Sequence, residues 1–101
     1  MNQVDVKNLN PKQLLQCALM CSYTYYHRYY ALIDDEVFDL IMKKLYDEWD
    51  NFEHQHKYLL TKEDLKAGTA FKIKVKDYPQ MVVNSAEMWM DKKAIQENMG
   101  P

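Results

Sequence analysis

Glycine is scarce in this 101-residue chain, which contains only Gly68 and Gly100. A phosphate-binding loop needs several glycines close together, because only glycine lets the backbone approach a phosphate closely. The serines Ser22 and Ser85 also lie outside the G-x-S-x-G pattern of a nucleophile elbow. The sequence therefore carries no signature of a phosphate loop or of a serine hydrolase.

The chain has only two cysteines, and it lacks long apolar runs and an excess of positive charge. Cys17 and Cys21 have no further ligands at a familiar zinc spacing, so we expect buried free thiols and no metal. No apolar run approaches the roughly 18 residues of a membrane span, and no secretory signal opens the chain. A cytoplasmic protein without membrane contact is therefore expected. The net charge is −2, so no direct nucleic-acid binding is expected.

Two helices are predicted in the first half of the chain. Asn10 can cap a helix over about 11–30, and Pro11 suits its first position. A second helix is expected from the cap Asp34 to about residue 54, with one apolar stripe. That stripe consists of Phe38, Ile41, Met42, Leu45, Trp49 and Phe52. Because the connection is short, we expect an antiparallel helical hairpin.

The second half is predicted to combine helical and extended segments. A short helical turn is expected between the cap Thr61 and the terminating Gly68. The segment AFKIKVK (70–76) alternates apolar and cationic residues, which is typical of a half-buried strand. QMVVN (80–84) is expected to return as a second strand. A helical tail should follow, packed through Met88, Trp89 and Ile95.

The expected fold class is mainly α (α+β), with an antiparallel helical hairpin, a short β-hairpin and a C-terminal helical segment. Residues 1–9 are polar and are expected to be a flexible N-terminus. Residues 10–98 are expected to form a single domain. Within it, 10–55 hold the helical hairpin, and 61–98 hold the short helix, the β-hairpin and the C-terminal helix.

One segment, YTYYHRYYALIDDEVFD (23–39), holds five of the eight tyrosines and four acids. The expected hairpin brings the tyrosine end of the first helix towards Asp35 and Asp39, which are four residues apart on one helix face. Aromatic rings stack on flat ligands, and carboxylates accept hydrogen bonds from ribose hydroxyls or amides. The residues equally fit a tyrosine-rich hairpin interface whose hydroxyls reach solvent.

The same segment resembles domain Ia, the N-terminal helical module of NAD-dependent DNA ligases. That module has a pattern close to YY-x-x-D-x-P-x-I-S-D-A-E-Y-D-x-L. Tyr25-Tyr26 and the run from Ile33 to Asp39 align with it without a gap. A weaker similarity follows at YPQMVVNS (78–85), where the ligases have P-M-L-S-L.

The resemblance implies binding of NAD or nicotinamide mononucleotide, because domain Ia closes over that half of NAD. The implied cofactor-binding residues are Tyr25, Tyr26, Asp35, Phe38 and Asp39. Phe38 replaces a family tyrosine and lacks its hydroxyl. The family loop also differs, since Tyr29 and Ala31 stand for its Asp and Pro, and Asp34 for its Ser.

The chain contains no K-x-D-G motif, so the lysine that takes the adenylyl group in those ligases has no counterpart. We therefore expect a non-catalytic module that binds a nicotinamide or ADP-ribose-type nucleotide. One alternative is the small subunit of a split NAD-dependent DNA ligase, acting with a separate nucleotidyltransferase chain. Another is a protein-interaction accessory protein that has lost nucleotide binding. His27, Arg28, Tyr29 and Tyr30 lie outside the matching positions, and the sequence assigns them no role.

Overall fold

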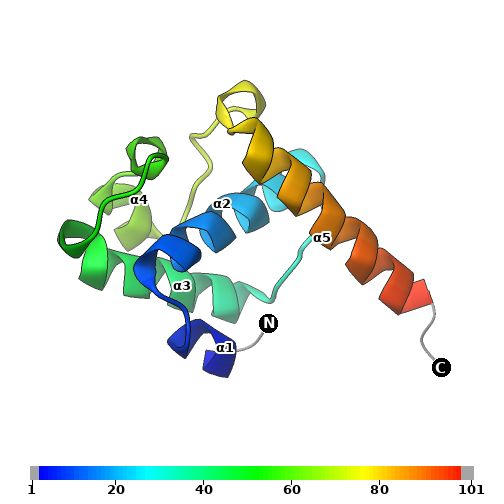
Figure 1. Cartoon of the computed structure of the whole chain (residues 1–101), viewed down its shortest axis with the longest axis horizontal. Helices are drawn as coiled ribbons and strands as arrows, with labels where there is room; N and C mark the ends of the chain where they lie inside the picture. The colour runs from blue at the N-terminus through cyan, green and yellow to red at the C-terminus, as the bar shows by residue number, and fades with distance from the viewer. Residues whose placement is uncertain (1–2, 99–101) are drawn as a thin grey trace.

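A computed structural model of the protein describes residues 3–98, which contain five α-helices and no strand (Figure 1). The helices are α1 (Gln3–Lys7), α2 (Pro11–His27), α3 (Asp35–Glu48), α4 (Lys62–Ala67) and α5 (Gln80–Asn98). Three 3₁₀ turns lie in the connections, at Trp49–Asn51, Lys57–Leu59 and Val75–Asp77. Helix α2 packs against both α3 and α5, while α1 and α4 pack on α3. The described helices include none that is long and apolar enough to cross a membrane.

The predicted helical hairpin is present as α2 and α3, which run in opposite directions (Figure 1). Asn10 caps α2 as expected, since its Oδ1 accepts the N–H of Gln13 at 2.9 Å. Helix α2 ends at His27, earlier than predicted. The reason is Tyr29, whose φ of 55° is left-handed and cannot continue a helix.

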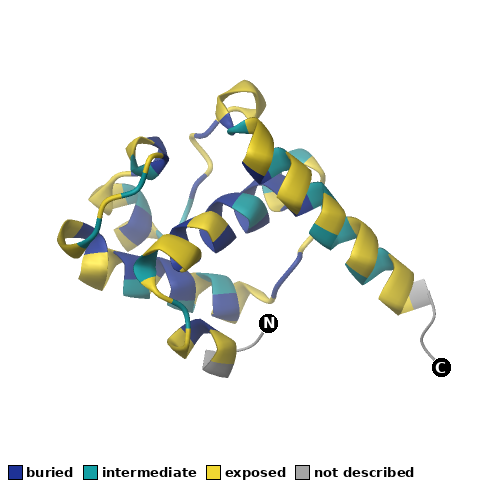
Figure 2. Ribbon diagram, viewed as in Figure 1, coloured by how far each residue is buried: buried dark blue, intermediate teal, exposed yellow. Residues whose placement is uncertain are grey.

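The core lies where α2 faces α3, and dark blue residues mark it in Figure 2. Leu14, Leu15 and Leu19 of α2 are fully buried there, as are Ile41 and Leu45 of α3. Burying each of these side chains contributes roughly 1.5–3 kcal/mol. Helix α3 ends at Glu48, earlier than predicted, so Trp49 and Phe52 of the predicted stripe lie beyond it in and after a 3₁₀ turn. The stripe still faces the core, although its two phenylalanines, Phe38 and Phe52, are only half-buried.

The predicted β-hairpin is wrong. Of the three residues expected to face inward, Phe71 and Val75 are 75% and 55% exposed, and only Ile73 is buried. The segment predicted as the return strand is instead the beginning of α5. In this helix Val82 and Ala86, which are four residues apart, are both buried. A helix satisfies its own backbone hydrogen bonds, whereas an isolated two-stranded hairpin is at best marginally stable.

Other expectations for the chain's ends also differ from the structure. Part of the segment expected to be flexible forms α1, where Val6 is fully buried and its carbonyl oxygen accepts the Nζ–H of Lys44 at 3.2 Å. In α5, Met88 and Ile95 are 62% and 57% exposed, so their predicted packing is wrong. Trp89 is half-buried against the core.

The short helix α4 is confirmed, and its cap is the one that the sequence predicts. Thr61 Oγ1 accepts the N–H of Asp64, and the Asp64 carboxylate accepts the N–H of Thr61 at 2.8 Å. Gly68 ends the helix with a φ of 71°, a left-handed conformation that glycine adopts without strain. This places Gly68 beside α3, close to Asp39.

Helix α5 holds the connection between α2 and α3 through several polar contacts. Arg28 forms an ion pair with Glu87 at 2.7 Å, and the hydroxyl of Tyr30 donates to Glu97 at 3.0 Å. The ammonium of Lys93 donates to two carbonyl oxygens of the connection, those of Ala31 at 2.9 Å and Leu32 at 3.2 Å. Two residues without a role in the sequence pattern, Arg28 and Tyr30, thus attach the connection to α5.

His27 and Tyr29 also have no role in the sequence pattern, and their surroundings in the structure differ. His27 Nε2 lies 3.0 Å from the carbonyl oxygen of Ile73, which attaches α2 to the loop before α5. Tyr29 exposes 90% of its side chain, and its left-handed backbone reverses the chain after α2. Tyr29 therefore directs the path of the α2–α3 connection through its backbone conformation.

Candidate functional site

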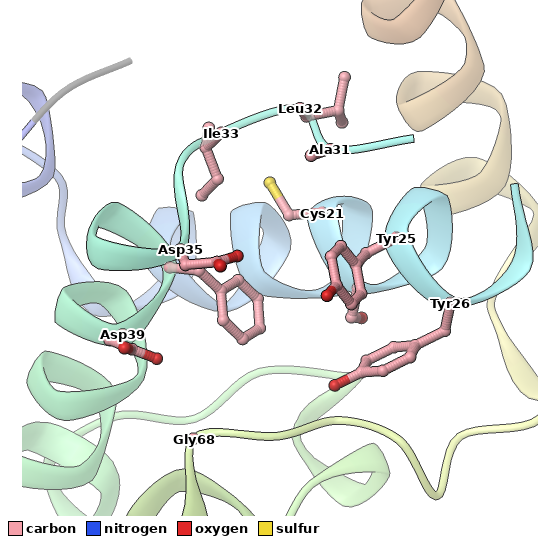
Figure 3. Close-up of a pocket in the computed structure, with 11 residues that line it drawn as sticks. Cys21, Tyr25, Tyr26, Ala31, Leu32, Ile33, Asp35, Asp39 and Gly68 are labelled. Carbon is pink, nitrogen blue, oxygen red and sulfur yellow. The ribbon is translucent and has the colours of Figure 1, made fainter. Parts of the chain in front are cut away.

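A cavity of about 270 Å³ lies between α2, the following connection, α3 and Gly68. All five residues implied by the ligase resemblance line it: Tyr25, Tyr26, Asp35, Phe38 and Asp39. Figure 3 shows Tyr25 and Tyr26 on one side of the cavity and Asp35 and Asp39 on the other. The structure thus places side chains from two helices around one space.

On the tyrosine side of the cavity, the ring of Tyr26 is held by contacts and the ring of Tyr25 is exposed. The hydroxyl of Tyr26 hydrogen-bonds to Thr69 Oγ1 at 3.0 Å, and its ring packs edge-on against Phe71 with centroids 5.7 Å apart. Tyr25 meets Tyr26 edge to face at 5.1 Å, yet remains 51% exposed. The exposed Tyr25 ring is therefore available to stack on a flat ligand.

The opposite side of the cavity is acidic. Asp35 and Asp39 are exposed and lie one turn apart on α3. Neither carboxylate forms an ion pair or a hydrogen bond within residues 3–98, and no basic side chain of that range lines the cavity. The cavity therefore carries two negative charges that remain available to a cationic or hydroxyl-bearing ligand.

Residues that the sequence did not indicate complete the lining. Ala31, Leu32 and Ile33 of the connection contribute one wall, and Gly68 lies at the Asp39 end. Cys21 lies one helical turn before Tyr25 on the same face, a spacing that could have indicated it. The connection could not be found this way, because its path depends on contacts with α5 far along the chain.

Cys17 and Cys21 are buried thiols that form no disulfide, as expected. Their Sγ atoms lie 4.0 Å apart, and only Cys21 lines the cavity. The hydrogen bond between the thiols lowers the pKa of Cys17, while the same bond and burial raise the pKa of Cys21. Cys21 therefore presents a protonated thiol to the cavity at neutral pH.

Ser22, also in the lining, connects the cavity to the core. Its Oγ donates to the carbonyl oxygen of Leu19 at 3.0 Å and lies 2.9 Å from the Tyr78 hydroxyl. Tyr78 is 5% exposed, and burial raises its pKa to about 12. The phenol of Tyr78 is thus neutral at pH 7 and contacts the cavity lining through Ser22.

Stability is expected to fall as pH rises from 10 towards 12. In that window Tyr78 loses its proton in the unfolded chain, at its ordinary pKa near 10, before it does so in the folded protein. The loss attributable to Tyr78 is at most about 2–3 kcal/mol. Urea denaturation across this range checks it, with Tyr78→Phe as the comparison. The variant should show a shallower decline, and equal declines in both proteins would contradict the assignment to Tyr78.

Comparisons with known proteins give no relative of this chain: no protein-family model, no curated protein and no solved structure matches it. Within the described residues, no group of three or more His, Cys, Asp or Glu side chains could hold a metal ion. The chemistry of the site therefore follows from the cavity itself, which offers aromatic rings, two carboxylates and a thiol.

Proposed function

We propose that this domain is a non-catalytic binding module for the nicotinamide mononucleotide half of NAD, held in the cavity between α2 and α3. One observation carries the proposal. Five residues that a nicotinamide-binding pattern implies, drawn from two different helices, all line the same cavity.

The chemistry of the cavity supports a cationic aromatic ligand. The oxidised nicotinamide ring is positively charged, and an aromatic face such as that of Tyr25 attracts a cation by about 0.5–2 kcal/mol. The carboxylates of Asp35 and Asp39 add attraction and can accept hydrogen bonds from an amide or from ribose hydroxyls.

The cavity is large enough to enclose only part of a dinucleotide. Its volume of about 270 Å³ lies just below the range of ligand pockets, roughly 300–1,000 Å³. A ring and its ribose match this space better than all of NAD does. Because Tyr25 stays half-exposed beside it, a ligand would keep one face open to solvent.

Calorimetric titration with oxidised and reduced nicotinamide mononucleotide tests the proposal. The oxidised form should bind with a Kd of about 0.1–1 mM, in keeping with a half-open site. The reduced ring is neutral, so it should bind at least about five-fold more weakly. Tyr25→Ala should reduce the preference, because only the carboxylates then attract the cationic ring. Tyr58→Ala should leave it unchanged, since Tyr58 is an exposed tyrosine outside the cavity. Equal binding of both forms, or no binding, would contradict the proposal.

The open face of the cavity favours a second candidate function, that of the small subunit of a split NAD-dependent DNA ligase. Tyr25, Asp35 and Asp39 are all exposed, so a separate nucleotidyltransferase chain could close over them. Ligase activity that appears only when the two chains are mixed would support this role. A protein that binds a partner chain but no nucleotide would instead be an accessory interaction protein.

A further inference from the structure

We infer that the hollow beside the cavity, between α3 and α4, is the phosphate subsite of the same nucleotide. This inference rests on the proposed function. The hollow has a volume of about 520 Å³ and shares two lining residues, Asp39 and Gly68, with the cavity. The two spaces therefore adjoin at these residues, where one ligand would lie across both.

Two lysines supply the positive charge that a phosphate needs. Lys43 of α3 and Lys66 of α4 are exposed and line the hollow from its two sides. Neither forms an ion pair or a hydrogen bond with a described residue, in contrast to Lys62, Lys72 and Lys93, each of which pairs with a carboxylate. The ammonium groups of Lys43 and Lys66 are therefore available to an anion.

The junction between the two spaces suits the ribose that joins the ring to the phosphate. Asp39 lines both spaces, and its carboxylate can accept hydrogen bonds from ribose hydroxyls. Gly68 faces it without a side chain, and a Cβ there would lie 3.5 Å from Asp39 Oδ1. A side chain at position 68 would therefore contact the Asp39 carboxylate at the junction. The nicotinamide ring would then lie beside Tyr25, the ribose at Asp39 and the phosphate beyond Gly68.

The net charge that a phosphate meets in the hollow depends on the two lysines. The hollow also contains the carboxylates of Asp39 and Asp47, so its four charged side chains sum to zero. Removing both lysines leaves two carboxylates facing the phosphate, and like charges repel. The phosphate should then change from a favourable group to an unfavourable one.

A comparison of nicotinamide mononucleotide with nicotinamide riboside, which lacks the phosphate, tests the inference by calorimetry at low ionic strength. The natural protein should bind the mononucleotide about five- to ten-fold more tightly, and added salt should shrink the difference. In Lys43→Ala/Lys66→Ala the riboside should bind at least as tightly as the mononucleotide. Lys74→Ala/Lys76→Ala is the matched control. It removes the same charge from exposed lysines outside both spaces, and should keep the preference.

The possible results separate this inference from the proposed function. If the riboside binds but the mononucleotide binds no more tightly, the phosphate subsite is wrong and the nicotinamide site stands. A preference that survives the loss of both lysines, or that falls equally in the control, would also overturn the subsite. If neither compound binds, the proposed function fails and this inference fails with it.

Discussion

Replacing Asp35 and Asp39 together by asparagine is expected to weaken binding of oxidised nicotinamide mononucleotide about 100-fold. Hydrogen bonds to charged groups contribute about 1.5–3 kcal/mol each, and the exposure of these two carboxylates favours the low end of that range. A loss near 1.4 kcal/mol at each position corresponds to ten-fold each. Asparagine keeps the shape of the side chain, so the change removes charge with little effect on volume.

The same turn of α3 provides a matched control. Asp34 and Glu36 are also exposed, flank Asp35 in the sequence and do not line the cavity. Asp34→Asn/Glu36→Gln removes the same two charges, and asparagine remains a good residue at the N-cap position. We expect less than a three-fold change in Kd for this control. Equal losses in the two double variants would mean that the general charge of the helix end, rather than contact in the cavity, governs binding.

Met42→Ala is expected to lower the free energy of unfolding by about 3 kcal/mol. Met42 is 1% exposed on the core face of α3, and truncating a buried methionine to alanine costs about 2–5 kcal/mol in lost burial and residual cavity. A domain of this size is stable by only about 5–10 kcal/mol, so a large part of its stability would be lost.

The same substitution on the surface should have little effect. Met88 is 62% exposed on α5, and Met88→Ala should change the free energy of unfolding by less than about 0.5 kcal/mol. Urea denaturation of both variants measures the difference. Similar losses at the two positions would show that Met88 is covered in solution, for example by a partner chain.

Helices α2, α3 and α4 could be predicted because each of their signals is local. The Asn10 cap, the apolar stripe of α3 and the Thr61 capping box all act within a few residues, and the structure contains all three. The run AFKIKVK misled because alternation reports a strand only where one face is buried. Here the exposed Phe71 lies in a loop, and the exposed Val75 begins a 3₁₀ turn.

The residues of the candidate site also divide into those that a local pattern predicts and those that it does not. Tyr25, Tyr26, Asp35, Phe38 and Asp39 could be proposed from a pattern that spans fifteen positions of sequence, 25–39. Gly68 could not, because it reaches the cavity through the packing of α4 on α3. Lys66 likewise meets Lys43 only through that packing. Contacts between distant segments depend on the tertiary structure, which no local pattern encodes.

The attachment of the α2–α3 connection to α5 means that the proposed nucleotide site is not built by the helical hairpin alone. Lys93 and Glu97 do not themselves line the cavity, yet they hold Ala31, Leu32 and Tyr30 in place from more than sixty residues away in the sequence. A peptide containing α2 and α3 would carry all five candidate residues while its connection lacked these anchors. Variation that tunes affinity can therefore arise in α5 with no change to any residue in contact with the ligand.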